Sequence, residues 1–182
     1  MKIGIDIDDT ITDTRSLQIK YWKDYIKSYP NENYTENLPD SINGFSDSYV
    51  QIFWDIYREQ LFDAPIKNNV DLITNKLKEN GHTLCIITSR SDNKYKDLKK
   101  RIREFMEFNN IHIDIIYTGI RNKGKFCYEN NFDLFIDDSI DHVKAAKEYG
   151  INAILFNKNT NYEGLQTDNW LDLYEIIKKM NL

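Results

Sequence analysis

Two aspartates, Asp6 and Asp8, stand two residues apart, directly after a run of branched apolar residues at the start of the chain. Side chains two positions apart on an extended segment face the same way, so both carboxylates reach one place. Carboxylates held together raise each other's pKa unless a cation offsets their charge. Oxygen ligands without soft donors favour magnesium, which keeps water and phosphate oxygens as its other ligands. The pair therefore indicates metal-assisted chemistry on a phosphate group.

Hydroxyls, cations and further acids follow three other apolar runs. They are Thr88, Ser89 and Arg90 after the second run, Thr118, Gly119, Lys123 and Lys125 after the third, and Asp137, Asp138 and Asp141 after the fourth. A phosphoryl group needs a cation and hydrogen-bond donors of its own, and a lysine with the Thr88 hydroxyl can supply them. All these residues can meet only if the runs are strands that end at one edge of a sheet.

The elements between these residues predict such a sheet. Five apolar runs read as buried strands, at 3–7, 84–87, 113–117, 134–136 and 153–156. Continuous apolar runs are typical of parallel strands covered on both faces. Helical patterns separate them at 68–80, 91–109, 139–149 and 168–180. We expect an α/β, Rossmann-like parallel sheet of about five strands with helices on both faces, with ligands bound beyond the carboxyl ends of its strands.

The segment 14–64 interrupts this alternation and is too long for a crossover loop. It contains two helical stretches, at 16–29 and 46–62, and is dense in aromatic residues. We expect a small helical cap at 14–64, inserted after strand one of a core formed by 1–13 and 65–182. Of the adjacent residues Phe53 and Trp54, we expect at most one to face a substrate and the other to lie in the core of the cap.

Taken in order, these residues resemble the motifs of the haloacid dehalogenase superfamily. The matching positions are Asp6, Asp8 and Thr10 in the DxDxT pattern, Thr88 after strand two, Lys123 before strand four, and the pair Asp137 and Asp138 at its end. In detail the chain looks like the 5'(3')-deoxyribonucleotidase-like branch. That second likeness rests on the helical cap, the Thr-Ser pair in IITSR, the short spacing from lysine to LFIDDS, and a final helix that carries Trp170.

The resemblance implies a role for each matching residue. Asp6 is the nucleophile that forms an aspartyl-phosphate, and Asp8 is the general acid and base. Mg²⁺ is held by Asp6, the backbone carbonyl of Asp8, and Asp137. The phosphoryl group is bound by Thr88, Ser89 and Lys123. An Asp at position 8 favours hydrolysis of phosphate esters over dehalogenation.

Several assignments stay open at the level of the sequence. Lys123 is preferred to Lys125 because it shares a helix face with core residues. Asp138 and Asp141 either serve the metal or cap the next helix. Arg90 either contacts substrate or pairs in solvent. The scattered histidines, His82, His112 and His142, have no ligand spacing and are expected to be structural or solvated.

The predicted function is magnesium-dependent hydrolysis of a phosphomonoester, with a nucleoside monophosphate as substrate. The alternatives are a phosphatase of a sugar phosphate or other small metabolite, and a catalytically weak module that binds phosphorylated ligands. A signalling receiver domain also gathers acids, Thr and Lys around magnesium, but it carries its phosphorylated Asp after strand three. Here strand three is followed by Thr118 and Gly119, which disfavours that class.

The composition limits the kinds of partner that this protein is expected to bind. The formal net charge is -5, so the overall field of the protein does not attract a nucleic acid polymer or an anionic membrane. The N-terminus meets an acid at its sixth position, before any apolar stretch of the length that a signal peptide needs, so we expect none there. No run reaches membrane-spanning length. We expect a cytoplasmic enzyme that acts on a small phosphorylated metabolite, and homo-oligomerisation stays open.

Overall fold

The apolar runs of the sequence form one parallel sheet in the computed structural model, which describes residues 1–30, 45–158 and 161–180. The chain divides into two units. One, called the core unit below, comprises Met1–Thr12 with Ile66–Leu182; the other, called the inserted unit, is Asp13–Pro65. No helix among the described residues combines the length and the apolar character needed to cross a membrane.

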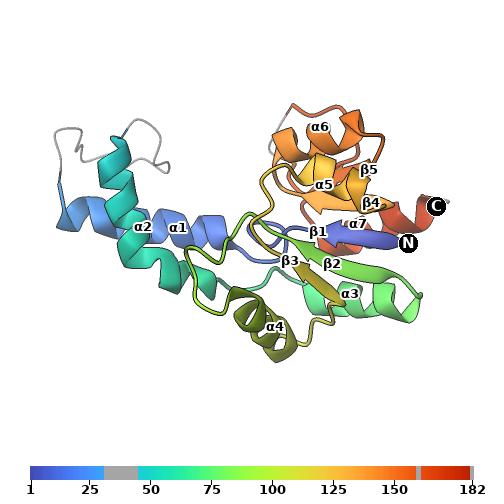
Figure 1. The fold of residues 1–182 in the computed structure, drawn as a ribbon, viewed down its shortest axis with the longest axis horizontal. Helices are drawn as coiled ribbons and strands as arrows, with labels where there is room; N and C mark the ends of the chain where they lie inside the picture. Colours follow the sequence, from blue (N-terminus) through green and yellow to red (C-terminus); the bar gives the residue numbers. More distant parts are fainter. Residues whose placement is uncertain (31–44, 159–160, 181–182) are drawn as a thin grey trace. The chain divides into compact units, whose positions relative to one another are not determined.

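The sheet of the core unit has five parallel strands in the order β3-β2-β1-β4-β5 (Figure 1). The strands are β1 (Lys2–Ile5), β2 (Thr83–Ile87), β3 (Ile115–Tyr117), β4 (Leu134–Asp137) and β5 (Asn152–Leu155). β1 is central, with Ile3 paired to Leu84 on one side and to Leu134 on the other. The predicted α/β fold class is therefore confirmed, with strand ends within two residues of the expected positions.

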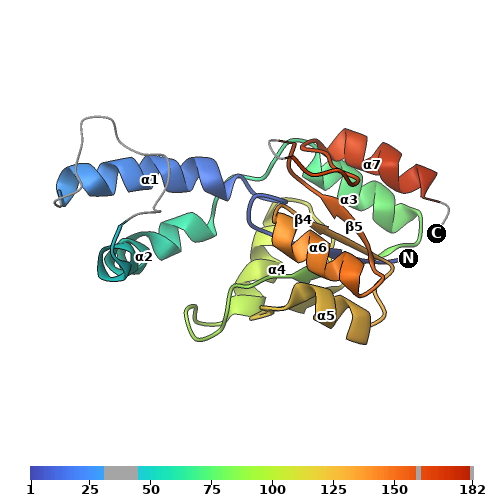
Figure 2. The same ribbon diagram turned by 90° about the horizontal axis from the view of Figure 1, so that it is seen from above.

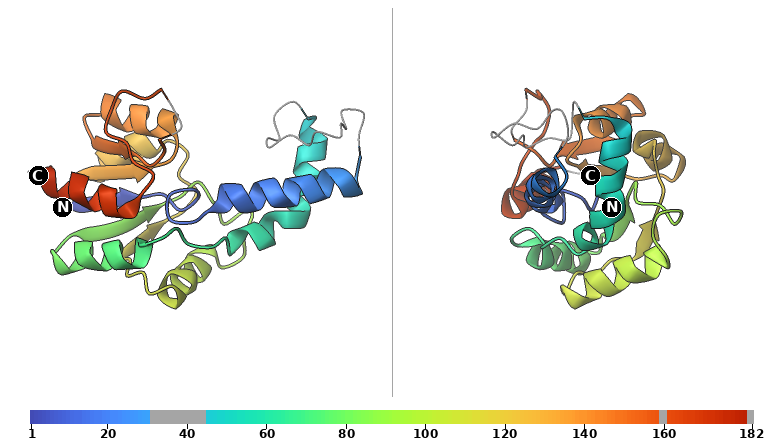
Figure 3. Two further views of the ribbon diagram at one scale, coloured as in Figure 1. Left: turned by 180° about the vertical axis from the view of Figure 1, so that it is seen from behind. Right: turned by 90° about the vertical axis from the view of Figure 1, so that its left-hand side faces the viewer.

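Helices cover both faces of the sheet. They are α3 (Val70–Glu79), α4 (Leu98–Phe108), α5 (Lys123–Glu129), α6 (Ile140–Glu148) and α7 (Trp170–Lys179). α5 and α6 lie on one face, whereas α3, α4 and α7 lie on the other, with α3 beside α7 (Figures 2 and 3). The helix expected at 91–109 begins only at Leu98, because the preceding residue, Asp97, has a left-handed backbone with φ 51° that no helix interior accepts.

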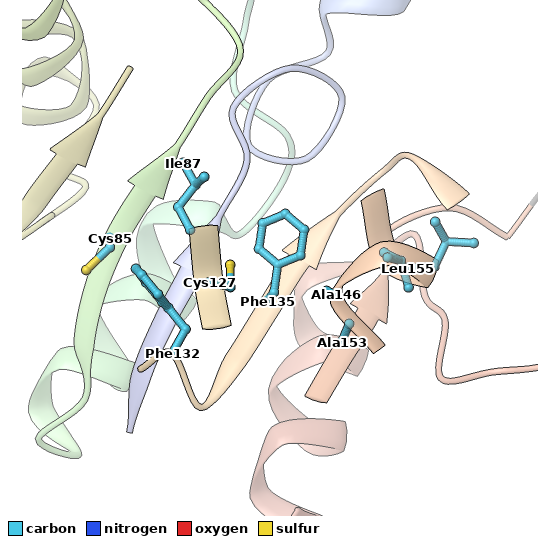
Figure 4. Close-up of a cluster of buried hydrophobic side chains, with 9 residues drawn as sticks. Cys85, Ile87, Cys127, Phe132, Phe135, Ala146, Ala153 and Leu155 are labelled. Atoms are coloured by element: carbon cyan, nitrogen blue, oxygen red, sulfur yellow. The ribbon is translucent and has the colours of Figure 1, made fainter. Parts of the chain in front are cut away.

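The face beneath α5 and α6 is a buried apolar cluster. Its members are Cys85, Ile87, Cys127, Phe132, Phe135, Val143, Ala146, Ala153 and Leu155 (Figure 4). The strand residues of this cluster are spaced two apart, as the pleat requires. Burial raises the pKa of the Cys85 thiol to about 11 and that of Cys127 to about 12, so both cysteines are unreactive apolar residues of the core.

The inserted unit contains α1 (Thr14–Ser28) and α2 (Asp47–Phe62), which pack through aromatic rings. Ser46 caps α2 by accepting a hydrogen bond from the backbone N–H of Tyr49. Phe53 is fully buried and meets Trp22 edge-on, with ring centroids 5.2 Å apart. The neighbouring Trp54 is half-buried at the margin of the same cluster.

Candidate active site

Adjacent strands bring the first acids together. Asp6 follows the last residue of β1 and donates its backbone N–H to the carbonyl of Ile136 on β4, at 3.0 Å. Asp137 is the last residue of β4. Both side chains are buried at the carboxyl edge of the sheet, with Asp137 completely so. The parallel pairing of β1 and β4 therefore fixes the distance between two acids that lie 131 residues apart in the sequence.

Lys123 joins these two acids. Its Nζ lies 2.5 Å from Oδ1 of Asp6 and 2.7 Å from Oδ2 of Asp137, and the lysine itself is 2% exposed. Burial alone would lower the pKa of Lys123, but the two carboxylates outweigh it and raise that pKa above its ordinary value. Lys125, by contrast, is exposed and pairs with Glu129 along the helix. Of the two lysines that the sequence left open, the structure places Lys123 among the acids.

The position of Lys123 depends on the residue that follows it. Gly124 faces α6, where a Cβ would lie 2.5 Å from the carbonyl carbon of Ala145 and 2.6 Å from the nitrogen of Ala146. Both are backbone atoms, which cannot move aside as a flexible side chain can. Only glycine therefore lets the start of α5 lie against α6, and this contact carries the lysine into the site.

Three acids form a group that could hold a metal ion. Oxygen atoms of Asp6, Asp137 and Asp138 lie within 4.8 Å of one another. Burial, with the neighbouring carboxylates Asp137 and Asp8, raises the pKa of Asp6 to about 7 in spite of Lys123. Burial and the charges of Asp137 and Asp6 raise the pKa of Asp138 to about 8. The raised pKa values show that the ionised forms of these buried acids are disfavoured without a cation beside them. A donor set made only of oxygens fits a hard divalent cation such as Mg²⁺. Asp141 is exposed in the first turn of α6 and lies outside this group.

His142 is a site residue that the sequence reasoning missed. Its Nδ1 lies 3.2 Å from both carboxylate oxygens of Asp137. The backbone N–H of Ser139 donates to the same carboxylate at 2.9 Å. Burial alone would raise the pKa of Asp137, but hydrogen bonds from His142 and Lys123 hold it below its usual value. The position of His142 in the first turn after the Asp137–Asp138 pair was the signal that could have revealed it.

Asp8 is not among the acids of the three-acid group and pairs with Arg90. The guanidinium donates through Nε to Oδ2 at 3.1 Å and through Nη2 to Oδ1 at 2.7 Å. The Arg90 side chain is only 8% exposed, whereas that of Asp8 is 38% exposed. Arg90 therefore faces an acid of the site, rather than pairing in solvent.

The loops after β2 and β3 hold the remaining polar residues. Thr88 is buried, and its Oγ1 accepts the backbone N–H of Arg90 at 3.1 Å. The hydroxyl of Ser89 donates to the carbonyl of Ile120 at 3.1 Å, so here it links two loops. Thr10 lies in the turn after β1, where its carbonyl accepts the indole N–H of Trp170 at 3.0 Å. The final helix thus braces the loop that carries Asp6 and Asp8.

No protein-family model matches the sequence, and no curated protein matches it either. Solved structures match the fold. A candidate beta-phosphoglucomutase from Thermotoga maritima superposes with a TM-score of 0.70 at 16% identity, covering 99% of this chain and 100% of that one. A predicted phosphoglycolate phosphatase from Haemophilus somnus gives 0.66 at 16% identity, covering 97% of both chains. A Bacillus subtilis chain assigned as a haloacid dehalogenase-like hydrolase, crystallised with magnesium, gives 0.67 at 16% identity over 97% of this chain and 98% of that one. The chain therefore has the fold of the haloacid dehalogenase-like hydrolases.

Proposed function

We propose that this chain, built on the haloacid dehalogenase-like fold, is a magnesium-dependent phosphomonoesterase that works through an aspartyl-phosphate on Asp6. One observation carries the proposal: Lys123 is buried between Asp6 and Asp137, and an oxygen of Asp138 lies within 4.8 Å of an oxygen of each of these acids. A buried cation beside a carboxylate nucleophile is what transfer of a phosphoryl group needs, since charge builds up on its oxygens.

The residues divide the reaction into two steps. In the first, a carboxylate oxygen of Asp6 bonds to phosphorus while the bond to the leaving oxygen breaks, and Asp8 protonates that oxygen. In the second, water attacks the phosphorus, Asp8 takes a proton from that water, and the Asp6–phosphorus bond breaks to release inorganic phosphate. Lys123 and the hydroxyl of Thr88 bind the phosphoryl oxygens in both steps, with Ser89 beside them.

Mg²⁺ would be held by Asp6, Asp137 and Asp138, together with the backbone carbonyl of Asp8. When bound, it offsets the charge of the acids and neutralises the phosphoryl oxygens. Asp138 joins the expected set because it lies in the three-acid group, whereas the carboxylate of Asp8 is engaged by Arg90.

The leaving group is a small organic alcohol of one of two classes. A nucleoside monophosphate was expected from the sequence, but no comparison supports the nucleotidase-like branch. Two solved structures with this fold are described as a beta-phosphoglucomutase and a phosphoglycolate phosphatase. A sugar phosphate or a similar small metabolite therefore fits as well. The catalytic residues act only on the phosphoryl group, so the inserted unit, as a cap, would select the leaving group.

A hydrolysis screen tests the proposal. The unaltered protein is incubated with Mg²⁺ and deoxynucleotides, ribonucleotides, sugar phosphates, phosphoglycolate and p-nitrophenyl phosphate, with and without excess chelator. We expect turnover that needs Mg²⁺ and that Asp6→Asn abolishes, because an amide is a poor nucleophile of the same shape. Turnover in chelator, or in the folded Asp6→Asn protein, would contradict the mechanism. Binding of phosphate esters without turnover would favour the ligand-binding module.

A further inference from the structure

The pairing of Arg90 with Asp8 is built, not incidental. Two N–H groups of one guanidinium reach both oxygens of one carboxylate, which fixes its orientation as well as its distance. The guanidinium is desolvated, since its side chain is 8% exposed, so losing its partner would leave a charge in a place that water barely reaches.

The backbone of Arg90 is held from two sides. Its N–H donates to Oγ1 of Thr88 at 3.1 Å, and its carbonyl accepts the N–H of Gly119 at 2.6 Å. Gly119 has a φ of 72°, a conformation that glycine adopts without strain. The loops after β2 and β3 together thus aim the guanidinium at Asp8.

The hydrogen bonds also say which form of Asp8 this arrangement suits. Both oxygens accept hydrogen bonds from Arg90, and only a carboxylate has two oxygens that act purely as acceptors. A protonated carboxyl would have to point its O–H at the guanidinium of Arg90, which has no acceptor. The arrangement therefore suits the ionised form of Asp8, which is the form that acts in the second step.

We propose that Arg90 is a positioning residue for the second step of the proposed reaction: it holds the Asp8 carboxylate ready to take a proton from the water that hydrolyses the aspartyl-phosphate. The proposal rests on the proposed function and adds to it. Asp8 remains the catalytic residue, because Arg90 acts on the proton transfer only through that carboxylate. Each carboxylate oxygen has a second lone pair besides the one that Arg90 engages. The Asp8 side chain is 38% exposed, so water can reach it.

This role predicts an unusual kinetic pattern. For an enzyme with a covalent intermediate, kcat/KM reports the steps up to phosphorylation, whereas kcat includes the hydrolysis that follows. p-Nitrophenyl phosphate is the suitable probe because its leaving group needs little protonation. Loss of the hydrogen bonds from Arg90 to Asp8 should then slow the second step alone. As a result, kcat and KM should fall together while kcat/KM is nearly unchanged.

The experiment compares Arg90→Gln and Arg90→Lys with the unaltered protein and with Arg103→Gln, an exposed arginine on α4. We expect kcat of Arg90→Gln to fall about 10- to 100-fold, up to the lower end of the range for loss of acid–base help, with a parallel fall in KM. Arg90→Lys should be intermediate, since a single ammonium cannot hold two oxygens in one orientation. Both variants should release a burst of p-nitrophenol and retain phosphate on the protein, and Arg103→Gln should behave as the unaltered protein.

A double variant supplies the decisive arm. Asp8→Asn with Arg90→Gln should be no slower than Asp8→Asn alone, because Arg90 acts through Asp8. Any of four results would overturn the inference and leave the proposed function standing. They are a loss in kcat/KM as large as that in kcat, the absence of a burst, losses that multiply in the double variant, and failure of both Arg90 variants to fold. An unaltered protein without turnover on any ester would overturn the proposed function, and this inference with it.

Discussion

Nδ1 of His142 is equidistant, at 3.2 Å, from the two carboxylate oxygens of Asp137. Residues behind a metal ligand orient it, and their loss typically lowers metal affinity by about 10- to 100-fold. We expect His142→Ala to raise the Mg²⁺ concentration needed for half-maximal kcat by about tenfold, which is the low end of that range. The measurement is kcat against Mg²⁺ concentration, with His112→Ala, on the exposed edge of the core unit, as the matched control. An unchanged half-activating concentration would show that the imidazole does not orient Asp137.

The close approach of α5 to α6 gives a second prediction. A methyl group at position 124 would press on the backbone of Ala145, so Gly124→Ala should cost about 1–3 kcal/mol of stability, as overpacking usually does. At about 2–4 °C per kcal/mol for a chain of this size, the melting temperature should fall by several degrees. Activity should fall further than stability explains, since Lys123 moves with the helix. Lys125→Ala, on the exposed side of α5, should change neither, and equal behaviour of both variants would contradict the packing argument.

The acid cluster predicts a pH-dependent stability in the absence of metal. The pKa of Asp6 is raised from 3.8 to about 7 and that of Asp138 from 3.8 to about 8. The folded state therefore binds more protons than the unfolded state between these values, so stability from these groups is full below pH 4 and is lost as pH rises toward 8. We expect the melting temperature in chelator to fall across this window, and Mg²⁺ to restore it most at the upper end.

Neutral replacements test the same explanation. Asp138→Asn should flatten the fall in chelator and reduce the stabilisation by Mg²⁺, because an amide neither titrates nor carries the charge that the ion offsets. Asp141→Asn, exposed on α6, is the control. If the two variants gave the same pH profile, the three-acid group would not be the source of the effect.

The adjacent aromatics of the inserted unit give the last prediction. Phe53 is fully buried, so Phe53→Ala should destabilise the unit by about 3–5 kcal/mol. Trp54 is half-buried, and Trp54→Ala should cost less stability. If a base or sugar stacks on it, kcat/KM for that metabolite should fall while hydrolysis of p-nitrophenyl phosphate persists. Equal losses on both substrates would show that Trp54 serves only the packing of the unit.

Periodicity predicted the fold because its strands are continuous apolar runs, and the same reasoning separated Lys123 from Lys125 through helix phase. What it could not predict depends on pairs far apart in sequence. Arg90 and Asp8 are separated by 82 positions, and the sequence around either residue does not indicate that the two side chains pair. The late start of α4 was missed because Asp97 adopts a left-handed conformation that its residue type permits but does not require.

The two thiols buried beneath α5 and α6 have a practical consequence. Cys85 and Cys127 are the only cysteines of the chain, and both are shielded and held in the protonated form that alkylating reagents attack poorly. The native protein therefore behaves toward maleimide dyes as if it had no cysteine. A single cysteine placed at exposed Asp55 on α2 and another at exposed Lys99 on α4 can be labelled without altering the core. Fluorescence transfer between them would follow the distance between the inserted unit and the core unit as a phosphate ester is turned over.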